Sequence, residues 1–150
     1  MEARERFTNI LAPIDGSACS INAGRLAVEL AAAFQAQITF VYVVDTTAVE
    51  EMARSLRRPI ERIQGEMEAN GQRYLDYLTQ QARAHGLEVR QAIRFGVPYA
   101  EISGLAREDS ANLIVIGQVG RHGPRRLMMG SVTERVIELA PCAVLVVKPE

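Results

Sequence analysis

Lysine is almost absent from this chain: Lys148 is the only one, and the other cationic residues are arginines. A Walker A loop needs a lysine in the pattern G-x-x-x-x-G-K-[ST], so the sequence excludes a conventional P-loop NTPase. The dinucleotide fingerprint G-x-G-x-x-G is missing where the first predicted strand meets the first predicted helix. A receiver-type phosphoacceptor would need an aspartate at the end of the third predicted strand, where the chain has Arg94 and Phe95. The sequence therefore excludes a conventional P-loop NTPase and disfavours a dinucleotide-binding fold and a receiver-type phosphoacceptor.

Cysteine and histidine are also scarce, with two of each. Cys19 and Cys142 are far apart in the sequence and form no C-x-x-C motif, which predicts reduced, unpaired thiols in a cytosolic protein. His85 and His122 do not have the spacing of metal ligands. We therefore expect no metal site made by protein side chains.

Long apolar runs and an excess of one charge are missing too. No stretch approaches the roughly 20 apolar residues that span a bilayer, and the N-terminal MEARERFTNIL lacks the apolar region of a secretory signal. These features predict a cytoplasmic protein with no membrane partner. The net charge of −1 gives no support for nucleic-acid binding. With 150 residues, of which 48% are hydrophobic, residues 1–150 are expected to form one domain.

Apolar segments alternate along the chain with segments of helical periodicity. The segment 46–58 has helical spacing, but Pro59 interrupts it and leaves its conformation open. Gly65 and Gly71 each weaken a predicted helix by about 1 kcal/mol. The order predicts a doubly wound α/β fold with a parallel sheet covered on both faces. The predicted strands are 7–14, 37–45, 87–93, 112–117 and 142–147, and the predicted helices are 17–34, 59–85, 99–109 and 131–140.

The last predicted strand, Cys142 to Val147, is uniformly apolar. If it lies at the edge of the sheet, its open side would invite pairing with another strand. We therefore expect a homodimer that forms through this strand.

A glycine-rich, basic stretch, GQVGRHGPRRLMMGS, separates the fourth predicted strand from the last predicted helix. Glycine lets backbone N–H groups approach a phosphate closely, and a helix N-terminus attracts anions. The same residues allow a second interpretation, because Ser131 to Glu134 reads S-V-T-E, a capping-box pattern that needs no ligand. From loop chemistry alone both interpretations stay open.

Four segments of the chain form a recognisable combination: Gly117-x2-Gly120-x9-Gly130-Ser131, Pro13-Ile14-Asp15-Gly16-Ser17, Val43-Val44-Asp45 and GSVTERVIELAPCAVLVVKP. With them, the chain resembles the universal stress protein family over nearly its whole length. The resemblance implies a single open, five-stranded parallel sheet of order 3-2-1-4-5 with helices on both faces, a Rossmann-like fold of the adenine nucleotide alpha hydrolase-like type. It also implies a dimer through the last strand.

By resemblance to the ATP-binding members, the chain is expected to bind ATP, ADP or AMP, with Mg²⁺ or Mn²⁺ held through the phosphates. Asp15 would bind the adenine and ribose end of the nucleotide, where its carboxylate avoids repulsion by the phosphates and accepts a hydrogen bond from a hydroxyl group. An aspartate that only caps its own turn is the alternative for this residue. The expected binding residues are Pro13, Ile14, Asp15, Val43 (through its backbone), Gly117 (at the ribose), Gly120, Arg121, Gly130, Ser131, Val132 and Thr133.

The sequence supplies no catalytic constellation beside the glycine loop. It contains no evident water-activating base there, and the P-loop lysine is missing. We therefore expect a nucleotide-binding regulatory protein of the stress response, acting on an unidentified protein partner, with little or no hydrolysis. The alternatives are a dimeric interaction module of the same fold that binds no nucleotide, and an enzyme acting on adenine nucleotides.

Gln118 and Val119, the two residues after Gly117, depart from the small polar and basic residues that are common at these positions in the family.

Overall fold

The computed structural model describes residues 2–120 and 128–150. Its centre is a five-stranded sheet in which all neighbouring strands run parallel, in the order β3-β2-β1-β4-β5. The predicted fold class and strand order are thus confirmed. The strands are β1 (Asn9–Pro13), β2 (Gln37–Asp45), β3 (Val89–Gly96), β4 (Leu113–Gly117) and β5 (Ala143–Val147).

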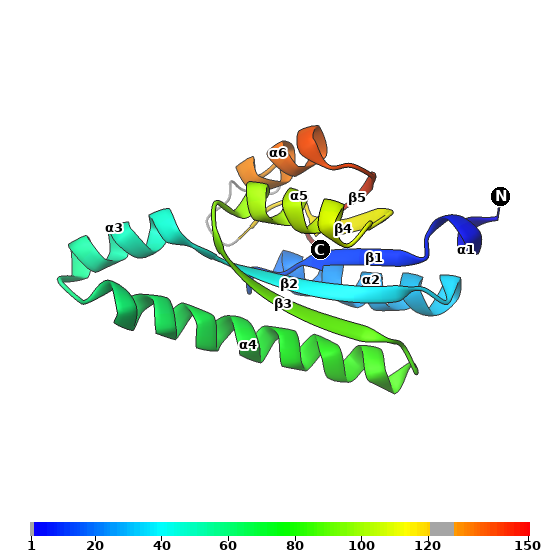
Figure 1. The fold of residues 1–150 in the computed structure, drawn as a ribbon, viewed down its shortest axis with the longest axis horizontal. Helices are drawn as coiled ribbons and strands as arrows, with labels where there is room; N and C mark the ends of the chain where they lie inside the picture. Colours follow the sequence, from blue (N-terminus) through cyan, green and yellow to red (C-terminus); the bar gives the residue numbers. More distant parts are fainter. Residues whose placement is uncertain (1, 121–127) are drawn as a thin grey trace.

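Helices cover both faces of the sheet (Figure 1). One apolar core lies between the sheet and helices α2 (Ala18–Phe34) and α4 (Ile60–Ala84). A second lies under α5 (Pro98–Glu108) and α6 (Ser131–Leu139). The central strands are buried from both sides, which explains why they are apolar runs rather than alternating patterns.

The ends of the predicted helices follow local signals. Ser17 caps α2, because its hydroxyl accepts a hydrogen bond from the amide of Ser20. Pro59 occupies the N-cap position of α4, and Gly86 follows the C-cap residue His85 with a left-handed φ of 73°. No helix in the described part of the chain is long and apolar enough to cross a membrane.

The segment that the sequence left open forms helix α3 (Thr46–Leu56). The carboxylate of Asp45 starts it by accepting hydrogen bonds from the amides of Thr47 and Ala48, at 3.1 and 3.2 Å. Arg57 ends it in the left-handed conformation. A four-residue helix, α1 (Ala3–Arg6), was not predicted, and it buries no side chain that could have marked it.

The third strand extends further than its sequence pattern indicated. Predicted to end at Ile93, it continues through Gly96, because Arg94, Phe95 and Gly96 pair with the last three residues of β2. Arg90, Gln91 and Phe95 of this strand are exposed, but Arg90 lies on the opposite face of the sheet from Gln91 and Phe95. Among the described strands, β3 pairs only with β2 and lies at the edge of the sheet.

The two glycines inside α4 have different surroundings, and we expect opposite effects when they are replaced by alanine. A β-carbon on Gly65 would meet nothing within 4 Å, so G65A should stabilise the protein by about 1 kcal/mol through helix propensity. A β-carbon on Gly71 would lie 2.6 Å from Cε1 of Tyr42, so G71A should destabilise it by about 1–3 kcal/mol through overpacking. Urea denaturation of both variants measures the two changes, and changes of the same sign would contradict this packing.

Candidate functional site

A cavity of about 480 Å³ opens at the carboxyl ends of β1, β2 and β4. β1 and β4 are neighbours at the point where the strand order reverses direction along the sheet. Ligands of open α/β sheets bind in the crevice at such a point. The cavity volume falls within the range usual for small-molecule sites, roughly 300–1,000 Å³.

The predicted binding residues that the structure describes all line this cavity. Arg121 lies outside the described residues, as do His122 and residues 123–127 of the glycine-rich stretch. The remaining predicted residues come from the end of β1, from β2, from the end of β4 and from the start of α6. They are Pro13, Ile14, Asp15, Val43, Gly117, Gly120, Gly130, Ser131, Val132 and Thr133.

Asp15 is held in a tight turn between β1 and α2. One carboxylate oxygen, Oδ1, accepts a hydrogen bond from the amide of Ser17 at 2.9 Å. The amide of Asp15 donates to Oγ of Ser20 at 3.2 Å. Gly16 has a φ of 87°, a conformation that favours glycine. Asp15 therefore caps its own turn, and this also orients its carboxylate at the edge of the cavity.

Gly120 brings the glycine loop against this carboxylate. A β-carbon on Gly120 would lie 2.6 Å from Oδ2 of Asp15, closer than real side chains come. Asp15 and Gly120 are far apart in sequence, and only the neighbouring position of β1 and β4 joins them. Any larger residue at position 120 would displace the carboxylate.

Gly130, rather than Ser131, is the N-cap residue of α6. The capping-box interpretation of S-V-T-E is therefore wrong, because Gly130 has an extended conformation whereas Ser131 is already the first helical residue. The amide of Gly130 donates to the carbonyl of Gln118 at 2.8 Å. A β-carbon on Gly130 would lie 3.2 Å from that oxygen and 3.3 Å from Cα of Val119. The amide of Gly130 therefore already has a partner, and the lack of a side chain allows the close approach of Gln118 and Val119.

The start of α6 lines one end of the cavity, through Gly130, Ser131 and Val132. The first amides of a helix have no partner within the helix, and here the N-cap residue has no side chain to satisfy them. These amides and the positive end of the helix dipole favour a bound anion. The Ser131 side chain is exposed beside them.

Thr133 ties α6 to the end of β4. Its hydroxyl donates to the carbonyl of Gly117 at 2.7 Å, and the residue is only 3% exposed. Gly117 packs equally closely on α2, since a β-carbon there would lie 2.9 Å from Sγ of Cys19. Sγ of Cys19 in turn lies 3.4 Å from the carbonyl of Val147, to which it donates. Thr133 therefore fixes the helix start against the strand end.

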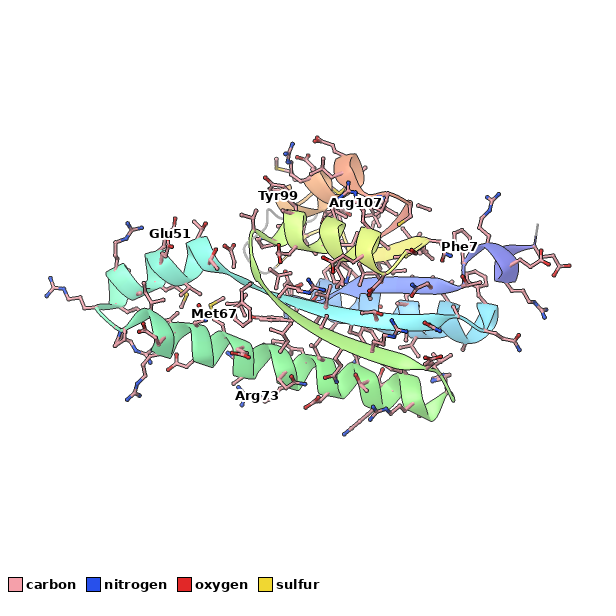
Figure 2. All side chains as sticks on the ribbon, in the orientation of Figure 1. Phe7, Glu51, Met67, Arg73, Tyr99 and Arg107 are labelled. Atoms are coloured by element: carbon pink, nitrogen blue, oxygen red, sulfur yellow. The ribbon has the colours of Figure 1, made fainter. Side chains whose placement is uncertain are left out.

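Sequence reasoning missed one end of the cavity, which α3, α4 and α5 complete. Met67 lies on the side of α4 that faces the sheet (Figure 2). Met67 recurs with Ile63 and Tyr74 at helix-like spacing in the sequence, but no signal there shows that it faces a cavity rather than a closed core. The additional lining residues are Ser20, Val41, Tyr42, Asp45, Ala48, Met52, Met67, Asn70, Pro98, Ile102, Ile116 and Val119.

Among the described residues, the charged side chains that line the cavity are those of Asp15 and Asp45, and Asp45 uses its carboxylate to cap α3. Within residues 2–120 and 128–150, no three His, Cys, Asp or Glu side chains gather in a way that could hold a metal ion. Both cysteines are free, and burial raises the pKa of the Cys142 thiol, which disfavours its thiolate.

Comparison with known proteins gives one consistent result. A family model described as the universal stress protein family matches residues 6–148. A universal stress protein of Methanocaldococcus jannaschii is 35% identical over 142 residues, which cover 95% of this chain and 82% of that protein. One of Bacillus subtilis is 31% identical over 147 residues, covering 95% of this chain and 99% of the relative.

Solved structures agree with the sequence relatives. The universal stress protein UspA from Lactobacillus plantarum superposes with a TM-score of 0.75 at 28% identity, over 95% of this chain and 99% of that one. A universal stress protein in complex with cAMP gives 0.67 at 23% identity, over 95% and 98% of the two chains. The protein from Archaeoglobus fulgidus in complex with dAMP gives 0.69 at 22%, over 95% and 99%. The chain therefore belongs to the universal stress protein family.

Proposed function

We propose that this cavity binds an adenine nucleotide, ATP in the first instance, and that the protein is a nucleotide-regulated member of the stress response. The observation that carries the proposal is the convergence of separate segments on one cavity at the switch point of the sheet. The Asp15 turn, Val43 of β2, the end of β4 and the start of α6 all line it. Family relatives solved with cAMP and with dAMP support the choice of an adenine nucleotide.

The chemistry of the lining sets the orientation of the ligand. The phosphates belong at the start of α6, where free helix amides and the helix dipole favour negative charge. The base belongs at the opposite end, where Tyr42, Val43 and Met67 provide apolar surface. Asp15 lies between the two ends and accepts a hydrogen bond from a ribose hydroxyl.

A divalent cation, Mg²⁺ or Mn²⁺, would be held through the phosphates, because they are the strongest anionic ligands that the complex would contain. The described residues at the start of α6 could offer the Ser131 hydroxyl beside it. The ion would neutralise phosphate charge, and it needs no carboxylate cluster from this chain.

The phosphate end is not equipped for hydrolysis in its described part. Its side chains there are those of Val119, Ser131, Val132 and Thr133, none of which is a general base. The Thr133 hydroxyl is already donated to the carbonyl of Gly117. We therefore infer that the nucleotide acts as a regulatory ligand with negligible turnover.

Asp15→Asn tests this function. The asparagine oxygen can still accept from the amide of Ser17, so the turn should persist while the negative charge is lost. Losing a charged hydrogen bond to the ribose should weaken ATP binding by about 1.5–3 kcal/mol, or roughly tenfold to a hundredfold. Calorimetric titration of both proteins with ATP and Mg²⁺ measures the change. Equal affinity in the two proteins would show that Asp15 does not bind the nucleotide. If the wild-type protein binds no adenine nucleotide, the better interpretation is an interaction module that binds none.

A further inference from the structure

We propose that Tyr74, on α4, is a positioning residue that holds the Asp15 turn in its binding conformation. The inference rests on the proposed function, because it concerns the carboxylate assigned to the ribose. Tyr74 is not among the cavity's lining residues. It would therefore act through the turn and not by touching the ligand.

The contact between Tyr74 and the turn is direct. A β-carbon on Gly16 would lie 2.7 Å from Cζ of Tyr74 and 2.9 Å from its hydroxyl oxygen. The far end of the ring thus packs closely on Gly16, the residue that follows Asp15. From the sequence, Tyr74 is expected to pack on the sheet or on a partner subunit, and the contact with the Asp15 turn could not be predicted.

The ring itself is fixed by the way α4 sits on the sheet. Gly71, one turn before Tyr74, lets the helix rest on the ring of Tyr42, which is only 4% exposed. The two tyrosine rings are neighbours, with centroids 6.4 Å apart. A second close approach lies on the α2 side, where a β-carbon on Gly24 would meet Cδ1 of Leu78 at 2.8 Å. Close packing at both points leaves Tyr74 little freedom to move.

The turn is bounded on its other sides by contacts already described. Ser17 and Ser20 hold it from the start of α2, and Gly120 lies against the carboxylate. Asp15 and Gly16 are consecutive, so Gly120 limits the turn at one residue and Tyr74 limits it at the next. Without the ring, the left-handed Gly16 could rotate and carry the carboxylate away from the cavity.

The same face of α4 also reaches the base end of the cavity. Met67, Asn70 and Tyr74 are spaced by three and four residues and so lie on one side of the helix. Met67 and Asn70 line the cavity, whereas Tyr74 contacts the turn. One helix therefore connects the wall of the base end with the turn at the ribose. Tyr74 also neighbours Tyr42 of the base end, so we expect Tyr74 to affect binding mainly, rather than only, through Asp15.

Amide hydrogen exchange tests the positioning without any nucleotide. The Ser17 amide, which donates to Oδ1 of Asp15, should exchange at least about tenfold faster in Tyr74→Leu. Tyr74→Phe keeps the ring and should exchange as the wild type does. Tyr77→Leu is the matched control, because Tyr77 lies on the same helix but is 40% exposed and bonded to Arg25. Unchanged Ser17 exchange in Tyr74→Leu, or equal acceleration in Tyr77→Leu, would overturn the proposal.

A double-mutant cycle then connects the turn to the ligand. Tyr74→Leu should weaken ATP binding about tenfold in the wild-type background and less than about twofold in Asp15→Asn. Equal losses in both backgrounds would show that the ring acts elsewhere. If the proposed function itself is wrong, the wild-type protein will bind no ATP. The exchange rate of the Ser17 amide still tests the role of Tyr74 in that case, because it is measured without nucleotide. If Tyr74→Leu does not fold, Tyr74→Met replaces it in both measurements.

Discussion

Gly130→Asp is expected to lower the affinity for ATP by roughly a hundredfold relative to Gly130→Asn, or about 2.7 kcal/mol. Position 130 is the N-cap of α6 and lines the cavity end assigned to the phosphates. Two unit charges 4 Å apart near a protein surface repel by about 4 kcal/mol, so a carboxylate there should expel a triphosphate. Both substitutions add the same bulk against Gln118 and Val119, so their difference isolates the charge.

Both variants at position 130 should fold, because aspartate and asparagine are favoured N-cap residues. Adenosine provides the second control, since it has no phosphate to repel and should bind the two variants equally. Calorimetric titration of each variant with ATP and with adenosine gives the four affinities. If ATP binds both variants equally well, the phosphates do not lie at the start of α6.

Leu145→Arg is expected to convert a dimer of this protein into a monomer. β5 is an edge strand, paired on one side only with β4, and Leu145 on it is 38% exposed. Ile137 and Leu139, near the end of α6, are 45% and 36% exposed in the segment that leads into β5. An unpaired strand edge with exposed apolar side chains favours pairing with a second copy. An arginine at its centre would bury an unpaired charge in that interface.

Sedimentation velocity at micromolar concentration measures this change. Leu56→Arg is the matched control, because Leu56 is 52% exposed but lies at the end of α3, away from β5. The wild type and Leu56→Arg should sediment as dimers and Leu145→Arg as a monomer. A monomeric wild type would show that the expected dimer does not form. A dimeric Leu145→Arg would show that the dimer interface does not include Leu145.

The strands and most helices could be predicted because burial leaves a direct mark on composition. A strand covered on both faces is mostly apolar, as β4 is along its whole length, as β1 is after Asn9, and as β2 is between its polar ends, apart from Thr39. Helix α3 could not be assigned in the same way. It buries only Val49 and Ala53, and its start depends on a carboxylate from the preceding strand. The end of β3 was missed because its last residues owe their conformation to pairing with β2.

Some residues of the candidate site could likewise be predicted from the sequence, and others could not. Gly117, Gly120, Gly130 and Asp15 stand in recognisable turns and loops, so their positions could be predicted from local sequence and family resemblance. Asn70 and Tyr74 could not, because the face that α4 turns to the cavity is set by the packing of Gly71 on Tyr42. That contact joins two elements and leaves no pattern in either of them. The capping-box error has the same origin, since the Gly130–Gln118 hydrogen bond decides where α6 begins.

Calorimetric titration of nucleotide-free wild-type protein with ATP, and separately with UTP, tests the central proposal most directly. The cavity's apolar base end and the amides of α6 predict that ATP binds once per chain with a micromolar dissociation constant. UTP, which carries the same triphosphate on a smaller base, should bind at least about tenfold more weakly. Saturable ATP binding with this preference would establish an adenine-nucleotide site. Absence of binding heat with ATP at several temperatures would contradict it.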